Sequence, residues 1–348
     1  MQAAVYLAPG KVEILDRPEP APEPDNLIIA VACCAICGTD LKLATSGHPR
    51  WKPGVVIGHE IAGRVVHVGR QVKGFAAGER VTLATTLSCG CCPFCARGLG
   101  NLCPNCRPIS IDYDGGFAPL LAVPSLALAG GNVIKAPSGV PDAAAALAEP
   151  MSCAINAQEL VGLKKGDRVA IIGGGPMGAI HAELAKAAGA AAVMVAQRSE
   201  PRLSLLRKLR GVIVIDGAHE DVRARVLAET EQLGADVVIV CAPDRAVFEQ
   251  SLGLARKGGA ISLFASLPKG ASDITLDSCA IHYNELRVVG CSDSRPEHVH
   301  KAINLLAEGK IDAAALVTHN LPLSRFHEGI ELMKRKKSLK VLIWPGWK

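Results

Sequence analysis

The stretch Arg168-Val-Ala-Ile-Ile-Gly-Gly-Gly-Pro-Met-Gly178 decides the fold of the middle of this chain. Its apolar beginning predicts a buried strand, and the residues that follow Met177 predict a helix. The glycines between them match the Gly-x-Gly-x-x-Gly turn that binds a dinucleotide when it joins a strand to a helix. Gly173 permits the tight turn, Gly175 lets the backbone approach a pyrophosphate, and Gly178 lets the helix pack on the sheet. We therefore predict a dinucleotide site that includes Gly173, Gly175, Pro176, Met177 and Gly178.

Strands and helices alternate on both sides of this turn. Apolar runs predict strands at residues 168–172, 192–196, 212–215, 236–241, 260–264 and 286–289. The segments between them predict helices at residues 177–188, 201–209, 221–232 and 246–256. Buried strands that alternate with helices form a parallel sheet covered on both faces. We therefore expect an α/β, doubly wound domain over residues 151–291.

The end of the second predicted strand indicates which dinucleotide binds. An NAD site places an acidic residue there, about 20 residues after the glycine turn, to bind the ribose 2′-hydroxyl. This chain has Gln197-Arg198-Ser199 instead, with Arg202 close behind. No carboxylate repels a 2′-phosphate, and two guanidinium groups can pair with one, so the sequence favours NADP. NAD stays open as the alternative, in which Gln197 binds a ribose and both arginines are solvated.

A run of cysteines predicts a first metal site. In Cys89-Gly-Cys-Cys-Pro-Phe-Cys95 and the later Cys103, four thiols fall at steps of three, three and eight residues. This spacing lets one lobe, at about residues 88–106, hold a zinc ion tetrahedrally with Cys89, Cys92, Cys95 and Cys103. Four sulfurs close the coordination shell, which is typical of a structural site. We interpret the two remaining thiols around the lobe, Cys91 and Cys106, as ordinary packing residues.

A second metal site is indicated upstream. Cys37-Gly-Thr-Asp40 precedes Gly58-His59-Glu60 by about twenty residues, and Glu149-Pro150 follows much later. Thiolate, imidazole and carboxylate all bind zinc, and three protein ligands with one open position make a catalytic site. Taken singly, Cys37 is more often a buried core residue. The prediction depends on these residues occurring together, and in one chain with the cysteine lobe.

The composition of the chain indicates its cellular compartment and excludes some classes of partner. The chain has 348 residues, 49% of them hydrophobic, which is enough for two globular domains. Its net charge of +5 is too small to indicate a nucleic-acid partner. The first residues lack the pattern of a signal peptide, and no segment reaches the roughly 20 apolar residues that span a membrane. Thirteen cysteines can indicate a secreted, disulfide-rich protein. The length of the chain, the metal-ligand spacing of its clustered cysteines and the missing signal pattern favour a reducing compartment instead, so we expect the cytoplasm.

The motifs quoted above, with Gly78-Glu-Arg-Val81 and an expected closing strand at residues 339–344, resemble a known family. They are similar to those of the zinc-dependent medium-chain alcohol dehydrogenases, in the branch of sorbitol (polyol) and threonine dehydrogenases. The resemblance implies a GroES-like, mainly-β catalytic domain, made of residues 1–150 and 292–348 and split by a Rossmann domain at residues 151–291. It also implies two zinc ions per subunit and a homodimer or homotetramer.

The resemblance implies roles for particular residues. Cys37 and His59 would bind the catalytic zinc, Glu60 would do so in some resting forms, and Glu149 would lie at or near the metal. Asp40 would hold a ligand imidazole in one tautomer, and Thr39 would carry the proton of the substrate alcohol. The chain departs from its relatives at Lys42, where a relay histidine is common, and near Asp293, where a polyol-binding arginine is expected.

These features predict an oxidoreductase that interconverts a small secondary alcohol and its ketone by hydride transfer. A polyol, sugar alcohol or cyclitol is the expected substrate, because Glu149 is of the polyol type. Threonine and simple alcohols are the alternatives. Two further hypotheses are a zinc-free reductase of activated C=C bonds and a non-catalytic zinc protein, and the ligand set Cys37, His59 and Glu149 argues against both.

Overall fold

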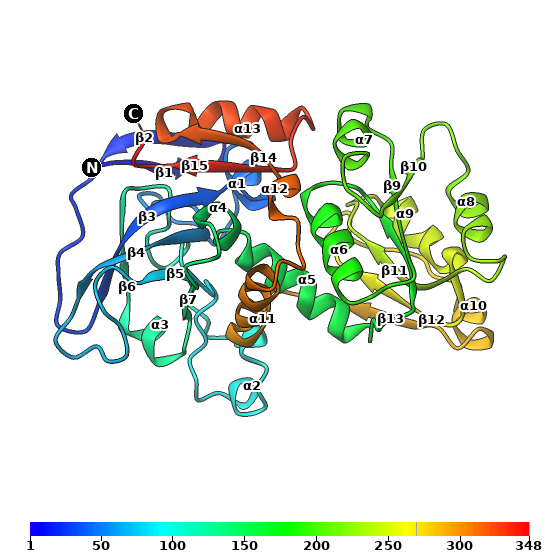
Figure 1. Cartoon of the computed structure of the whole chain (residues 1–348), viewed down its shortest axis with the longest axis horizontal. Helices are drawn as coiled ribbons and strands as arrows, with labels where there is room; N and C mark the ends of the chain where they lie inside the picture. Colours follow the sequence, from blue (N-terminus) through cyan, green and yellow to red (C-terminus); the bar gives the residue numbers. More distant parts are fainter. Residues whose placement is uncertain (269, 348) are drawn as a thin grey trace. The chain divides into compact units, whose positions relative to one another are not determined.

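The computed structural model describes residues 1–268 and 270–347. They form two compact units, one made of Met1–Ser152 with the chain from Asp293 onward and the other of Cys153–Ser292. The α/β class, with a β-rich unit and a parallel-sheet unit, confirms the fold class expected from the sequence (Figure 1). Among the described residues, every helix is too short or too polar to cross a membrane.

The first unit is built on a seven-stranded sheet. Its strands lie in the order β14 (Val317–Pro322), β15 (Lys340–Trp344), β3 (Leu27–Ala35), β4 (Glu60–Val68), β5 (Arg80–Leu83) and β7 (Val133–Lys135), and β6 (Leu120–Val123) also pairs with β3. A hairpin of β1 (Gln2–Ala8) and β2 (Lys11–Asp16) accompanies them. The closing strand predicted near the C-terminus is β15, and it pairs antiparallel with β3. Apolar side chains such as Ile29, Ile61, Leu83, Phe117 and Phe326 fill the core.

Strand register in this unit brings distant residues together. β3 and β4 run antiparallel, and Ala35 at the end of β3 pairs with Glu60 at the start of β4. Cys37, just past β3, and His59, just before β4, therefore emerge at the same edge of the sheet. The backbone N–H of Ile36 donates to Val341 of β15, at 2.9 Å, so the last strand reaches the same edge.

The second unit is a six-stranded parallel sheet. Its order is β10 (Ile213–Asp216), β9 (Ala192–Gln197), β8 (Arg168–Ile172), β11 (Ala235–Val240), β12 (Ala255–Leu263) and β13 (Arg287–Gly290). The order of a dinucleotide-binding sheet, 3-2-1-4-5-6, results when β8 is counted as the first strand. The connecting helices are α6 (Pro176–Ala187), α7 (Glu200–Leu206), α8 (Val222–Ala228), α9 (Arg245–Gln250) and α10 (Ser278–Tyr283).

Two predicted helices of this unit are wrong in their second halves. The helix expected at residues 221–232 ends at Ala228, because Glu231 and Gln232 adopt left-handed φ values of 54° and 64°. The helix expected at residues 246–256 gives way to a 3-10 turn at Ser251–Leu254, and β12 then begins at Ala255. Pairing of Ala255 with Ala235 of β11 overrides the helical pattern there.

Candidate functional site

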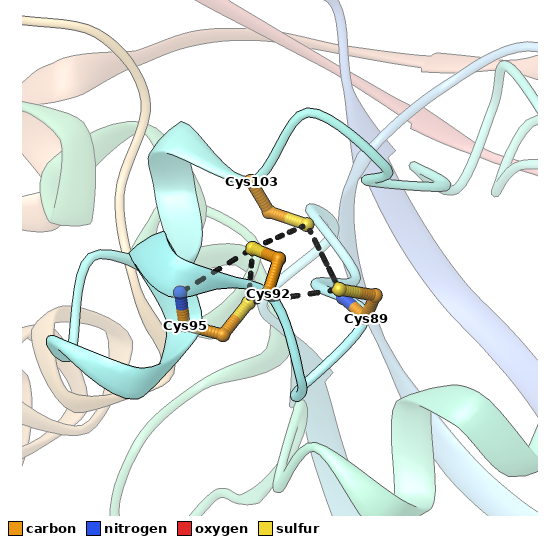
Figure 2. Close-up of side chains that lie close together, drawn as sticks. All are labelled: Cys89, Cys92, Cys95 and Cys103. Atoms are coloured by element: carbon orange, nitrogen blue, oxygen red, sulfur yellow. Dashed lines mark hydrogen bonds between the residues drawn. The ribbon is translucent and has the colours of Figure 1, made fainter.

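The four cysteines predicted to bind zinc converge on one point of the lobe (Figure 2). A short helix, α2 (Pro93–Ala96), carries Cys95, and Cys92 accepts the backbone N–H of Cys95 at 3.5 Å. Four sulfur pairs lie 3.5–3.9 Å apart, and all four sulfurs lie within 4.8 Å of one another. Sulfurs arranged tetrahedrally at about 2.3 Å from a zinc ion lie about 3.8 Å apart, so this set fits zinc.

Thiol acidity in the lobe also fits a bound cation. The backbone N–H of Cys91, followed by the thiol of Cys103, lowers the pKa of Cys89 to about 6. Burial raises the pKa of Cys103 to about 12. One sulfur of the set therefore ionises readily and another requires a strong positive charge, which a metal ion supplies when it binds a thiol.

A second candidate metal set lies at the sheet edge described above. Ligand atoms of Cys37, His59 and Glu60 all lie within 4.8 Å of one another. Cys37 immediately precedes α1 (Gly38–Leu43), and its sulfur lies 3.8 Å from the hydroxyl of Thr39. Sulfur, imidazole and carboxylate donors in one cluster match the ligand types of a zinc site with an open position.

Asp40 ties this cluster to the start of α1. Its Oδ2 accepts the backbone N–H of Cys37 at 2.8 Å, and its Oδ1 is buried with no hydrogen-bond partner among the described residues. Burial raises the pKa of Asp40 to about 6, and the nearby imidazole of His59 opposes that rise. Burial alone lowers the pKa of His59, but Cys37, Asp40 and Glu149 raise it well above its usual value. The cluster is therefore rich in negative charge, which a divalent cation offsets.

A buried lysine that the sequence analysis did not identify completes this region. Lys340 on β15 is 1% exposed and its ammonium donates to Oε1 of Glu60 at 2.6 Å and to the carbonyl of Ile36 at 3.3 Å. Glu60 is fully buried. The only signal in the sequence was a charged residue inside an otherwise apolar closing strand.

Glu149 lies close by but outside the set of three. It lies in the first turn of the helix α5 (Ala148–Leu160), and one of its carboxylate oxygens lies within 4.8 Å of one from Asp293. Burial raises the pKa of Glu149 to about 8, with further upward contributions from Glu60 and Asp293. Asp293 has a left-handed φ of 58° and accepts the hydroxyl of Thr86 at 2.5 Å.

The glycine turn of the second unit is shaped for close backbone approach. Gly173 has a φ of 108°, and a Cβ there would meet the backbone N of Ala242 at 2.6 Å. At Gly178 a Cβ would meet the carbonyl oxygen of Gly173 at 2.1 Å. Gly175 precedes α6, whose first two residues are Pro176 and Met177. The positive end of α6 therefore opens on a turn whose glycines carry no side chains of their own, which fits a pyrophosphate.

Donors surround the end of β9. The Oε1 atom of Gln197 accepts the backbone N–H groups of Arg198 at 2.8 Å and Ser199 at 3.1 Å. The guanidinium of Arg202 lies beside Gly175, where a Cβ would meet its Nη1 at 3.2 Å. Its Nε is buried with no hydrogen-bond partner among the described residues. Arg198 is more exposed and lies 3.9 Å from Asp244.

Comparison with known proteins identifies the class. Residues 23–137 match the family described as alcohol dehydrogenase GroES-like domain, and residues 176–308 match zinc-binding dehydrogenase. The chain therefore belongs to the zinc-dependent medium-chain alcohol dehydrogenase family. The enzyme class expected from the sequence, a zinc- and NAD(P)-dependent dehydrogenase, is confirmed.

Individual relatives cover almost the whole chain. A sorbitol dehydrogenase of Halalkalibacterium halodurans is 32% identical over 97% of this chain and 96% of its own length. An L-threonine 3-dehydrogenase of Pyrococcus furiosus is 33% identical over 95% of this chain and 94% of its own. A zinc-binding dehydrogenase of Sinorhizobium meliloti, solved with NADP, superposes with a TM-score of 0.89 at 32% identity and 99% coverage of both chains.

Proposed function

We propose that this chain is a zinc-dependent, NADP-linked dehydrogenase that interconverts a small polyhydroxylated secondary alcohol and its ketone. The observation that carries the proposal is the clustering of ligand atoms from Cys37, His59 and Glu60 within 4.8 Å of one another. Residues 1–150 and 292–348 form the catalytic domain in this proposal, and residues 151–291 bind the dinucleotide.

The proposed catalytic zinc is held by Cys37 and His59, with Glu60 and Glu149 as further carboxylate ligands. Bound zinc supplies a Lewis acid that lowers the pKa of an alcohol hydroxyl, and bound nicotinamide accepts a hydride. The lobe cysteines Cys89, Cys92, Cys95 and Cys103 hold the second, structural zinc.

The chain's own residues then orient groups and move a proton. Asp40 holds the start of α1 through the N–H of Cys37, and its charge, close to the imidazole of His59, favours one orientation of that ring. Thr39 takes the proton of the alcohol at Oγ1, a role supported by its 3.8 Å separation from the Cys37 sulfur. Lys42 replaces the usual relay histidine in this proposal, one turn further along α1.

The preference for NADP rests on the donors at the end of β9. Because two N–H groups already bond to Oε1 of Gln197, its amide offers N–H donors to a ligand, which suit a phosphate better than a ribose hydroxyl. Arg202 adds a partly buried guanidinium beside Gly175 and Arg198 an exposed one. The NADP-bound relative from Sinorhizobium meliloti supports the same choice.

Cofactor choice is tested by titrating NADPH and NADH fluorescence. The wild type should bind NADPH more tightly, and Arg202→Ala should weaken NADPH about tenfold while it changes NADH little. Arg207→Ala, which removes an exposed guanidinium that pairs with Glu200, is the matched control. Equal binding of both cofactors, unchanged in Arg202→Ala, contradicts the NADP preference.

Substrate class is tested with a panel of sugar alcohols, cyclitols, threonine and simple secondary alcohols, followed by NADPH formation. Turnover of sugar alcohols or cyclitols with the highest kcat/KM supports the proposal. Turnover confined to simple alcohols, or to threonine, refutes the polyol substrate and leaves the dehydrogenase chemistry standing.

We also propose a homodimer or homotetramer in the cytoplasm, with a small molecule as substrate and neither nucleic acid nor membrane as partner. The modest net charge of +5 supports the absence of a nucleic-acid partner. The thirteen free thiols support a reducing compartment.

A further inference from the structure

Cys91 is a fifth thiol of the lobe that the zinc set does not use. The four converging sulfurs belong to Cys89, Cys92, Cys95 and Cys103, which is a complete shell for zinc. Cys91 is exposed, so its expected role as a packing thiol is wrong. Its sulfur lies 3.8 Å from that of Cys89, a distance similar to those between the ligand sulfurs themselves.

Backbone geometry holds this pair of thiols together. Gly90, between them, has a left-handed φ of 74°, and a Cβ there would meet nothing within 4 Å. The positive φ, and not a lack of space for a side chain, therefore accounts for glycine at this position, because glycine adopts this conformation without strain. The turn keeps an exposed sulfur against a ligand sulfur, and closing a disulfide requires the pair to approach from 3.8 Å to about 2.05 Å.

We propose that Cys91 is an oxidation site through which hydroperoxides open the four-thiolate zinc site. The exposed thiol of Cys91 releases its proton to water and its sulfur attacks the peroxide O–O bond, giving a sulfenic acid on Cys91 and releasing hydroxide or alkoxide. The sulfur of Cys89 then attacks the sulfenic sulfur, which forms the Cys89–Cys91 disulfide and releases a second hydroxide. Two thiolates are oxidised by two electrons, and one peroxide is reduced.

Loss of Cys89 from the shell weakens metal binding in the lobe. A disulfide sulfur is not a thiolate ligand, so only Cys92, Cys95 and Cys103 remain. The affinity of a four-thiolate site for zinc depends on all four ligands. With one ligand lost, the lobe binds zinc more weakly and releases the ion. An external dithiol reverses the change, because it reduces the disulfide and is itself oxidised.

Solvent exposure favours oxidation of the Cys89–Cys91 pair over the other thiol pairs in the lobe. The sulfurs of Cys92 and Cys95 are closer, at 3.5 Å, but Cys92 is buried and Cys95 half-buried. Oxidation of thiols follows access as well as ionisation. Cys91 is the exposed member of the cluster and also the one that zinc leaves unbound, so peroxide reaches it first.

The test uses the full-length, zinc-loaded protein treated with hydrogen peroxide. Zinc release is followed with a chromogenic chelator, and the disulfide is located by peptide mass mapping. Cys91→Ser should slow zinc release by about tenfold or more. Cys279→Ser, which removes an exposed thiol on α10, should release zinc as the wild type does. A dithiol with added zinc should restore the metal content of the wild type.

Several outcomes overturn the proposal. These are release from Cys91→Ser at the wild-type rate, a disulfide that maps to Cys92–Cys95, or a lobe that holds no zinc before peroxide. Should Cys91→Ser fold poorly, Cys91→Ala and mass mapping of the wild type give the same decision. The proposal rests on zinc in the lobe and not on any substrate, and elemental analysis before treatment separates a failure of zinc binding from a failure of the oxidation step.

Discussion

The two candidate metal regions differ in where their ligands come from and in what surrounds them. The lobe takes four sulfurs from one short segment, and its contacts are sulfur–sulfur and N–H to sulfur. The upstream set joins the end of β3 to the start of β4, and beside it lie the buried charges of Asp40, Glu149 and Lys340. A closed sulfur shell stabilises a loop, whereas an open, mixed set among buried charges is suited to chemistry.

Removing one ligand from the upstream set should give the largest effect. His59→Ala should lower kcat/KM by about 10³-fold or more, because the open metal position is lost together with its ion. Zinc content should fall from two ions per subunit to one, with the circular dichroism spectrum unchanged. Near-normal activity with a single zinc per subunit would show that the lobe alone holds metal and that this comparison is mistaken.

The buried ion pair between Lys340 and Glu60, a member of this set, predicts a large loss of stability when it is broken. Lys340→Met leaves the fully buried carboxylate of Glu60 without its ammonium partner, which should cost about 3–5 kcal/mol in free energy of unfolding. Adding Glu60→Gln should recover much of that loss, because the unpaired charge is removed. Urea unfolding of the apoprotein measures both.

An exposed pair provides the matched control for Lys340. Lys135 donates to Oε1 of Glu79 at 2.6 Å, but Lys135 is 52% exposed, so Lys135→Met should cost no more than about 1 kcal/mol. If Lys340→Met lowers the free energy of unfolding no more than Lys135→Met does, the buried pair is not important for stability.

Opening the lobe should cost less than breaking the buried pair. Cys103 is buried, and Cys103→Ser removes one of the four sulfurs. A cross-link that closes a loop of this length stabilises the folded state by about 3 kcal/mol, because it lowers the entropy of the unfolded chain. Cys103→Ser should lower the free energy of unfolding by that amount at saturating zinc. Activity per folded molecule at low temperature should stay near that of the wild type. Complete loss of activity in a folded Cys103→Ser protein would assign the lobe a direct role in the reaction.

The same contrast explains what the sequence could predict. The lobe is local, so its spacing alone specified all four cysteines, and the glycine turn was predicted because its neighbours in sequence are its neighbours in space. The parallel sheet also followed from local apolar runs. Lys340 was missed because its partner Glu60 is 280 residues away, and nothing near either residue in sequence encodes the pairing. The helix predicted at residues 246–256 failed for a related reason, since strand pairing with β11 decides its last residues.

Two histidines, the half-buried His59 of the upstream set and the fully buried His181, differ in the same way. The thiol and carboxylates around His59 raise its pKa, whereas burial alone lowers the pKa of His181 to about 3. His181 on α6 is fully buried, with Gln158 3.2 Å from its Nδ1 and the ring of Phe264 at 4.5 Å. It is therefore neutral in the folded protein at pH values where the unfolded chain is protonated.

This difference predicts a pH-dependent loss of stability. Because the folded pKa lies below the unfolded value of about 6.5, the unfolded state binds more protons between pH 6.5 and pH 3, and stability falls as the pH falls through that window. The expected loss at pH 5 is about 2 kcal/mol relative to pH 7. His181→Gln should flatten the pH profile of urea unfolding by that amount, whereas His282→Gln, at an exposed position, should leave it unchanged. If the free energy of unfolding has the same pH dependence in the wild type and in His181→Gln, the buried imidazole accepts a proton without cost. The difference in pKa between His59 and His181 would then come from their neighbouring groups and not from burial.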